Sequence, residues 1–303
     1  MAINPPVSPR RGPSRTRIWL RRVVATVVIV LFLGGGFGIV YAATRGEEEA
    51  APPPPTTVAR KPPKPLRIVF PEGFTVEQMA DRITVVNRIA KKKRHVNPRL
   101  KAANYLKLTR NARLPKGFGA RRGKLEGFMF PATYEFLKGT TTKQLVKKQL
   151  DAFDVNWKKV DLAYAKARNL TPYEVLIIAS MVEKEAVVPS ERPLVARVIY
   201  NRLKQGMPLG IDATIRYGLD VPGTEALRES QLASDSPYNT RNRTGLPPTP
   251  IANPGLASMH AAAHPKPANY LFFVRKPDKK HHFFTASESE FLAKACEYGY
   301  GCG

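Results

Sequence analysis

The chain contains little cysteine, little histidine and few acidic residues. Its 303 residues include two cysteines and five histidines, with 24 acidic side chains against 49 lysines and arginines. Two cysteines without a second pair do not make a tetrahedral metal site, so Cys296 and Cys302 favour a short local disulfide. Catalytic motifs are also missing, because no glycine-rich phosphate loop precedes a helix and there is no His-Glu-x-x-His pair. We therefore expect no metal and no cofactor.

Acidic residues are scarcest in the first half of the chain. The formal net charge is +25, and no acidic residue lies between Asp81 and Glu126. A field of this sign favours a polyanionic partner, which is nucleic acid, anionic lipid head groups or an acidic wall polymer. We expect most of the basic side chains between residues 91 and 124 to lie on a solvent-exposed face of the protein and not in a dedicated binding patch. Charge alone does not choose among these partners, so the location of the chain has to decide.

Residues 23–43 form an uncharged, mostly aliphatic run that is about as long as a bilayer core requires. Arginines without any acid precede this run, and an acidic block follows it at residues 47–49, so the positive-inside rule predicts a cytoplasmic N-terminus. We predict a single-pass protein of the cell membrane whose residues after 43 lie outside the cytoplasm. The alternative is a cleaved signal peptide, since small residues lie near the end of the run. Either location argues against nucleic acid as the partner.

The rest of the chain divides into a spacer and two modules. Prolines at residues 52–55, 62, 63 and 65 indicate an extended spacer. Alternating hydrophobicity predicts a strand at residues 66–70, and Thr75 with Gln78 predicts a capped helix. The predicted boundaries are a basic tail at 1–22, the span at 23–43, the spacer at 44–65, a small module at 66–118 and a larger module at 119–303. The mixture of elements predicts an α+β fold.

The larger module contains the best-marked helix of the chain. Thr171, Pro172 and Glu174 form an N-terminal cap signature, and residues 175–182 are almost wholly apolar, so this helix should be buried. It ends in two glutamates, Glu183 and Glu185. Further helices are predicted at residues 192–205 and 256–263 and a strand at residues 270–274, while residues 212–254 are rich in turns.

A carboxyl group at the end of a buried helix is held rigidly and is partly desolvated. Desolvation raises the pKa of such a group, so that it keeps a proton near neutral pH and can act as a general acid. Cleavage of a glycosidic bond needs this proton at the leaving oxygen, and Glu183 or Glu185 is able to supply it. Periodicity does not choose between the two glutamates, and both also fit an ordinary charged helix end.

Two proline-rich loops follow, at residues 236–240 and 245–255. Rigid loops of this composition line clefts with fixed backbone groups, and amide side chains bind sugar hydroxyl and N-acetyl groups. Tyr200, Tyr217 or Tyr238 would be able to stack on a sugar ring, but for each of them taken singly the sequence favours ordinary packing. His281 and His282 lie next to each other on a predicted strand and so point to opposite faces.

The order of the motifs resembles a known family, the endolytic murein transglycosylases of the YceG-like (MltG) type. Residues 125–136 (LEGFMFPATYEF) resemble its entry motif and residues 179–185 (ASMVEKE) its catalytic motif. Four further stretches follow in the family's order, at residues 200–209, 212–218, 236–255 and 270–285. A membrane span and a small LysM-like module before the catalytic domain also fit the family.

The resemblance implies that Glu183 is the catalytic residue and that the reaction is lytic. The acid would protonate the oxygen between N-acetylmuramic acid and N-acetylglucosamine and then direct the muramyl 6-hydroxyl onto C1, which gives a 1,6-anhydro end and terminates the nascent strand. The implied partners are peptidoglycan glycan strands and peptidoglycan synthases. The residues expected to bind the substrate are Asn201, Asp212, Thr214, Tyr217, Tyr238, Asn239, Thr240 and His282.

Some positions depart from the family pattern, and other functions remain open. The departures are Ala213, Arg241, Thr249 and the pair Lys280 and His281, which affect loop geometry and substrate preference more than the reaction. A hydrolytic muramidase with Asp212 as a second carboxylate is the alternative among enzymes. A noncatalytic wall-binding scaffold is the alternative from another class.

Overall fold

The computed structural model describes residues 64–119 and 122–301. The predicted cytoplasmic tail, membrane span and nearly all of the spacer lie outside the described residues, as does Cys302, so these calls stay predictions. Among the helices of the described part, none combines the length and hydropathy that a membrane crossing requires. The described residues belong to one compact unit, and the description below concerns that unit.

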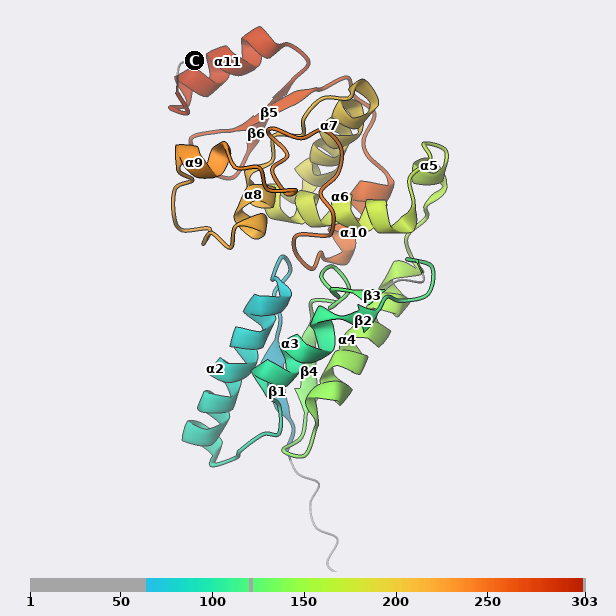
Figure 1. Cartoon of the computed structure of the whole chain (residues 1–303), viewed down its shortest axis with the longest axis vertical. Helices are drawn as coiled ribbons and strands as arrows, with labels where there is room; N and C mark the ends of the chain where they lie inside the picture. Colours follow the sequence, from blue (N-terminus) through green and yellow to red (C-terminus); the bar gives the residue numbers. More distant parts are fainter. Residues whose placement is uncertain (1–63, 120–121, 302–303) are drawn as a thin grey trace, which may run out of the picture. The chain divides into compact units, whose positions relative to one another are not determined.

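The first elements of this unit are two short sheets and three helices (Figure 1). In chain order they are β1 (Leu66–Val69), α2 (Val76–Arg94), α3 (Ala102–Arg110), β2 (Ala112–Arg113), β3 (Arg122–Gly123), β4 (Thr133–Phe136) and α4 (Thr142–Trp157). β1 pairs antiparallel with β4, and β2 pairs antiparallel with β3. In the β1–β4 pair Ile68 lies opposite Tyr134, and both side chains are buried against the helices.

Helix α2 begins where the sequence predicts it. Thr75 accepts a hydrogen bond from the backbone of Gln78, and the Gln78 side chain accepts one from the backbone N–H of Thr75. This capping box satisfies two amides that have no partner inside the helix. The helix ends at His95, whose backbone is left-handed with φ of 52°. The predicted N-terminal cap is therefore confirmed.

The remaining elements are mainly helical. In chain order they are α5 (Ala163–Lys166), α6 (Pro172–Glu185), η1 (Pro189–Glu191), α7 (Arg192–Gln205), α8 (Asp212–Gly218), α9 (Glu229–Leu232), α10 (Leu256–Ala263), β5 (Phe272–Arg275), β6 (His282–Thr285) and α11 (Glu288–Glu297). Helix α6 packs against α7, α8 and α10, while the β5–β6 hairpin packs against α11. These contacts surround α6 with other elements.

Helix α6 is buried as its composition predicts. Thr171 and Glu174 form a capping box, Pro172 occupies the first turn, and every residue from 175 to 182 is buried. Burial of a helix that is apolar on all sides removes a large area from water, which at about 25 cal/mol per Å² is a main source of stability. The predicted helices α7 and α10 are confirmed at their predicted bounds.

The fold is a mixed α+β structure, as the sequence indicates. The observed elements differ from the expected ones in several places, and helix α4 has no predicted counterpart. The region expected to consist of turns contains the short helices α8 and α9. The strand expected at residues 270–274 is β5, which begins at Phe272 and ends at Arg275. Helix α8 has seven residues, which is too short to show a clear helical period, and it is fixed by burial of Thr214 and Ile215. The domain boundary at residue 118 and the LysM-like character of the first module stay predictions.

Candidate active site

Glu183 lies in the last turn of α6 with a side chain that is 6% exposed. Its Oε2 atom accepts a hydrogen bond of 2.9 Å from the backbone N–H of Gly255, the N-cap residue of α10. Its Oε1 atom lies 3.9 Å from Nη2 of Arg192, the first residue of α7. The Arg192 Nε atom in turn donates to Oγ of Ser258. The carboxyl group is therefore held by three helices that meet at its position.

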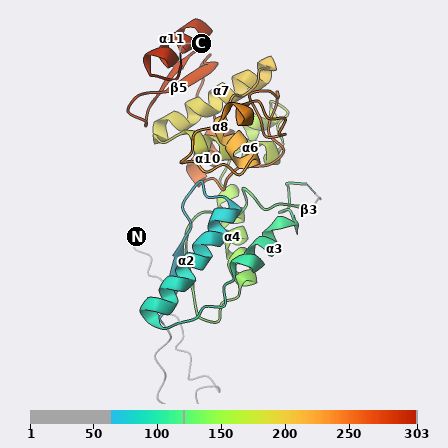
Figure 2. The same cartoon turned by 60° about the vertical axis from the view of Figure 1, so that its left-hand side comes forward.

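A second carboxylate, Glu72, approaches the same glycine. An ideal Cβ atom on Gly255 would lie 1.8 Å from Oε1 of Glu72, so a side chain at residue 255 has no room beside this carboxylate. Partial burial and the charge of Glu183 raise the pKa of Glu72, while Arg192 lowers it. Glu72 comes from the turn between β1 and α2, which lies against the α6 and α10 elements in both views (Figures 1 and 2).

Glu185 has the environment expected of a carboxyl group that keeps its proton. Burial raises its pKa to about 7, and the negative charge of Asp212 adds to this effect. The guanidinium of Arg275 lies 3.9 Å from Oε2 of Glu185 and lowers the pKa, but burial is the larger cause. Glu183 and Glu185 thus lie beside different partners, a difference that periodicity along α6 does not reveal.

His282 forms a buried pair with Glu191. Its Nδ1 atom lies 2.7 Å from Oε2 of Glu191, and its backbone N–H donates to Oε1 of the same carboxylate. The His282 side chain is 1% exposed, whereas the side chain of His281 is half exposed, so the two histidines point to opposite faces as predicted. Burial lowers the pKa of His282, while the hydrogen bond to Glu191 opposes the change. Glu191 immediately precedes Arg192 in the chain, and Arg192 lies 3.9 Å from Glu183. The His282–Glu191 pair is therefore linked through the backbone to the residue that faces Glu183.

Asp212 forms an ion pair, and two of the tyrosines pack against each other. The Asp212 carboxylate pairs with Nε of Arg241 at 2.7 Å. The rings of Tyr217 and Tyr238 pack edge to face at 5.2 Å, and the hydroxyl of Tyr238 bonds to Thr249 at 2.8 Å. Arg241 and Thr249 are two of the positions that depart from the family pattern, and both take part in hydrogen bonds of these loops.

The other expected substrate-binding residues hold the loops together. Thr214 and Thr240 share a hydrogen bond and are buried, and Asn239 donates to two backbone carbonyls. The Asn201 amide donates to the carbonyls of residues 268 and 270. Tyr200 donates its hydroxyl to the carbonyl of residue 262. These groups are already satisfied inside the protein, and direct contact with a substrate stays a prediction for each of them.

The chain is similar to known proteins of one family. The model of the YceG-like family matches residues 55–297, which is most of the chain. This chain belongs to the YceG-like family. The resemblance of its ordered motifs is thereby confirmed, and the motif that contains Glu183 lies inside the matched range of this YceG-like chain.

Named relatives of this YceG-like chain come from two bacteria. A Bacillus subtilis protein named endolytic murein transglycosylase is 38% identical over 152 residues, which are 50% of this chain and 42% of that protein. A Streptococcus pneumoniae protein of the same name is 33% identical over 224 residues, which are 68% of this chain and 40% of that protein. The chain thus spans less than half the length of the curated relatives it matches.

A solved structure shows a similar fold. The crystal structure of a putative YceG-like protein from Listeria monocytogenes is 32% identical in sequence and has a TM-score of 0.58, with 75% of each chain covered. The two chains therefore share a similar fold over three quarters of their length.

Sequence reasoning missed four residues of this site, namely Glu72, Glu191, Arg192 and Gly255. Glu191 and Arg192 lie six and seven residues after the motif at residues 179–185, and this closeness in sequence is the signal that points to them. Glu72 lies more than a hundred residues before Glu183, and a Pro-Glu-Gly turn carries no catalytic signal by itself. Only the folded chain brings these residues together.

Proposed function

We propose that this chain cleaves peptidoglycan glycan strands by lytic transglycosylation, with Glu183 as acid and base. One observation carries the proposal: a nearly buried carboxyl group ends a rigid apolar helix and is fixed by Gly255 and Arg192. Fixed hydrogen-bond donors and low exposure are what a carboxyl group needs to transfer a proton in a defined direction. The names of the related proteins support the same reaction class.

The proposed reaction needs no second nucleophile from the protein. Glu183 donates its proton to the oxygen between N-acetylmuramic acid and N-acetylglucosamine, and the C1–O bond breaks. The resulting carboxylate then accepts the proton of the muramyl 6-hydroxyl while O6 bonds to C1. The products are a 1,6-anhydromuramyl end and a free N-acetylglucosamine hydroxyl. Glu183 is protonated again at the end, so protons and bonds balance over one cycle.

His282, whose side chain is 1% exposed in the free chain, is proposed to bind the glycan. A carboxylate next to Nδ1 favours the tautomer with its proton on that atom, and Glu191 lies at this position. Nε2 is then an acceptor for a sugar hydroxyl or an amide N–H. Asp212 and Tyr217 are proposed to contact the strand from helix α8, where Asp212 lies near the carboxyl group of Glu185 and Tyr217 donates its hydroxyl to Glu126.

The experiment digests purified glycan strands with the full chain and weighs the products. A lytic cut gives an anhydro end that is one water lighter than a hydrolysed end. Glu183→Gln should lower the rate by about 10² to 10⁴ while the fold is retained, because it removes the transferred proton. Glu229→Gln on the exposed helix α9 is the matched control and should keep full activity.

The products also separate the two alternatives. Ends with the mass of a hydrolysed muramyl residue would favour the muramidase, in which Asp212 acts as the second carboxylate. Binding of strands without any product would favour the noncatalytic scaffold. Full activity of Glu183→Gln would show that this residue is not the acid.

We also propose that the chain acts at the outer face of the cell membrane, on nascent strands and beside peptidoglycan synthases. The support is the apolar run at residues 23–43 with its asymmetric flanking charges. A membrane-held enzyme of this kind would cut strands near the place where they are polymerised and so limit their length.

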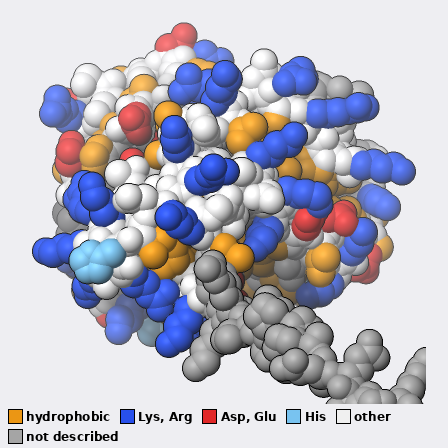
Figure 3. Space-filling model, turned by 90° about the horizontal axis from the view of Figure 1, so that it is seen from below, with side chains coloured by type: hydrophobic (Ala, Val, Ile, Leu, Met, Phe, Trp, Pro, Cys, Tyr) orange, Lys and Arg blue, Asp and Glu red, His pale blue; other side chains and the backbone are white. Residues whose placement is uncertain are grey.

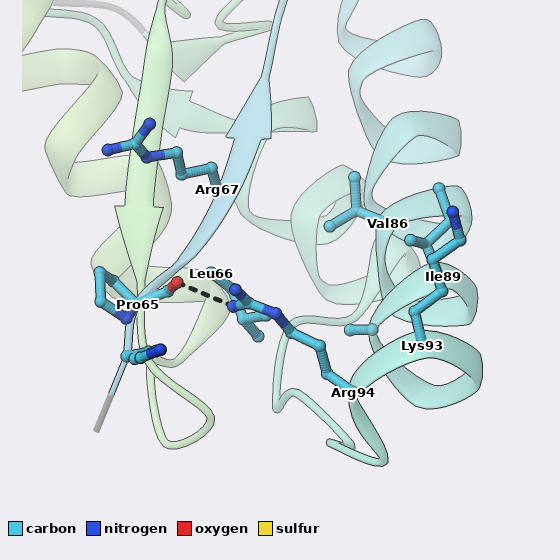
Figure 4. Close-up of a pocket in the computed structure, with 9 residues that line it drawn as sticks. Pro65, Leu66, Arg67, Val86, Ile89, Lys93 and Arg94 are labelled. Atoms are coloured by element: carbon cyan, nitrogen blue, oxygen red, sulfur yellow. Dashed lines mark hydrogen bonds between the residues drawn. The ribbon is translucent and has the colours of Figure 1, made fainter.

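The described residues add a feature that fits this location. A basic hollow of about 520 Å³ lies between the start of β1 and the last turns of α2, and Figure 4 shows the side chains around it. Its lining residues are Lys64, Pro65, Leu66, Arg67, Val86, Ile89, Ala90, Lys93 and Arg94. Arg94 donates to the carbonyl of Pro65, which joins the two walls. Figure 3 views the molecule from below and shows Lys and Arg side chains around small apolar areas.

A further inference from the structure

The turn between β1 and α2 lies beside the proposed catalytic glutamate. An ideal Cβ atom on Gly73 would lie 3.5 Å from Cγ of Glu183, so the space between this glycine and the Glu183 side chain is about one methyl group wide. Nζ of Lys184 lies 3.4 Å from the carbonyl oxygen of Gly73 and donates to it. The left-handed backbone of Gly73, with φ of 75°, permits this close approach.

Asn253 fixes the turn in this position. Its backbone N–H and its side-chain amide both donate to the carbonyl of Phe74 at 2.9 Å, and its carbonyl accepts from the N–H of Gly73 at the same distance. The Asn253 side chain also accepts from the backbone of Met129 and is completely buried. A buried amide with this many partners cannot move without leaving polar groups unsatisfied, so the position of the turn is well determined.

The turn brings Glu72 to the residue that binds Glu183. The N–H of Gly255 donates to Glu183, while the position of a Cβ atom on Gly255 is 1.8 Å from one Glu72 oxygen and 2.8 Å from the other. The two carboxyl groups therefore approach one residue from two sides. Glu72 is exposed to solvent, unlike Glu183, so a strand that reaches the Glu183 carboxyl group from the solvent is able to meet Glu72.

We propose that Glu72 is a second carboxylate of the active site, which stabilises the positive charge on the muramyl C1 atom as the glycosidic bond breaks. This inference rests on the proposed function. Glu72 forms no bond and transfers no proton in this step, because Glu183 supplies the proton and the 6-hydroxyl supplies the nucleophile. A fixed negative charge near the developing cation lowers the barrier because it needs little reorganisation during the reaction.

The role requires Glu72 to be ionised. Burial and the neighbouring charge of Glu183 raise its pKa above the ordinary value of 4.5. Activity should therefore fall as the pH drops through this raised pKa, which produces an acid limb in the pH–rate profile. The first module then has a part in catalysis, because its turn supplies a charge that α6 alone does not provide.

The experiment compares the full chain with its Glu72→Gln variant on purified glycan strands across a range of pH. We expect kcat to fall by about 10- to 100-fold and the acid limb that belongs to Glu72 to disappear, because glutamine keeps the shape and removes the charge. The melting temperature should stay the same, since Glu72 is exposed. Glu77→Gln, an exposed substitution in the first turn of α2, is the matched control and should leave both readouts unchanged.

Each other outcome has a definite meaning. A Glu72→Gln variant with wild-type kcat overturns the inference, and so does a lower kcat with an unchanged profile, which indicates a structural role. If the wild-type chain cleaves strands, these results leave the proposed function in place. If the wild-type chain gives no anhydro product, the proposed function is wrong and this role of Glu72 is wrong with it.

Discussion

At the scale of single residues, the site depends on close packing around one glycine. Gly255 donates its N–H to Glu183, and its Cα atom is approached by the carboxylate of Glu72. A residue with a side chain would displace this carboxylate, since the ideal Cβ position overlaps it. Conformational freedom is not the reason for glycine here, because the backbone of Gly255 is extended with φ of −76°. The reason is the absence of a side chain.

Gly255→Ala should therefore lower activity by moving Glu72 away from Glu183. The expected loss in kcat is similar to that of Glu72→Gln, at about 10-fold or more, with the fold retained because Glu72 is a flexible exposed side chain. The two changes should not be additive, since both remove the same charge from the same place. Kinetics of the two single variants and the double variant measure this directly.

Gly223→Ala is the control for the glycine substitution. A Cβ atom on Gly223 would meet nothing within 4 Å, so this variant should keep its activity. Full additivity of Gly255→Ala and Glu72→Gln would contradict the explanation, because it would mean that the alanine acts through another group.

At the scale of elements, a buried carboxyl group connects α2 to the loop before α10. Glu126 is 1% exposed and accepts hydrogen bonds from the backbone N–H of Val76, from the amide of Asn253 and from the hydroxyl of Tyr217. Val76 is the first residue of α2, so Glu126 satisfies an amide at the N-terminus of that helix. Burial nevertheless raises the pKa of Glu126 to about 8, although the Val76 amide opposes this change.

The raised pKa of Glu126 predicts a pH dependence of stability. The folded state binds the Glu126 proton more tightly than the unfolded state, whose carboxyl pKa is near 4.5. The contribution of this group to the free energy of unfolding is therefore largest at acidic pH. It should fall as the pH rises from about 5 to about 8, by up to about 4 kcal/mol from this group. Urea unfolding at several pH values measures the slope, and Glu126→Gln should remove about half of it below pH 7 and most of it between about pH 7 and 8.

Two features keep this test specific. Glu185 has a pKa of about 7 in the folded chain and contributes a slope of the same sign and of similar size up to that pH, which should remain in Glu126→Gln. Glu229→Gln, on the exposed helix α9, should retain the full wild-type slope. A Glu126→Gln variant with the wild-type slope would show that this group does not titrate as proposed.

At the scale of the whole molecule, charge is distributed unevenly along α2. The acidic residues Glu77 and Asp81 lie in its first two turns, whereas its last turn is basic at residues 91–94. The basic end adjoins the hollow beside Lys64, which is where the described chain begins. Ile89 is 49% exposed at this end, so the surface combines cations with apolar area. A surface of this composition favours the anionic head groups of a membrane.

The full chain in anionic vesicles should protect this end of α2 from hydrogen exchange. Peptides that cover residues 84–99 should exchange about tenfold more slowly in vesicles with phosphatidylglycerol than in neutral vesicles, because several lysines meet the charged surface. Added salt should weaken the effect. The variant that should lose the protection carries Lys91→Glu, Lys92→Glu and Lys93→Glu.

A matched variant carries the same change in charge at exposed positions elsewhere, namely Lys204→Glu, Lys279→Glu and Lys280→Glu. It should keep the protection. Equal exchange in both kinds of vesicle would contradict the membrane contact. Protection by a soluble anionic wall polymer in neutral vesicles would assign the surface to that polymer instead.

The sequence by itself determined the features that depend on neighbouring residues. The caps at Thr75 and Thr171 rest on contacts three residues apart, so they are visible in the sequence and are present in the structure. The burial of α6 follows from its composition, and the α+β class follows from the mixture of short strands and helices. The order of the motifs was sufficient to indicate the YceG-like family.

Only the tertiary structure decided which residues surround Glu183. The contacts to Gly255 and between His282 and Glu191 join residues 72 and 91 positions apart, and Glu126 meets Asn253 across 127 positions. Such contacts leave no periodic or capping signal, because the chain between them may take many paths. The two glutamates at the end of α6 were equivalent by periodicity, and packing gave Glu183 and Glu185 different partners.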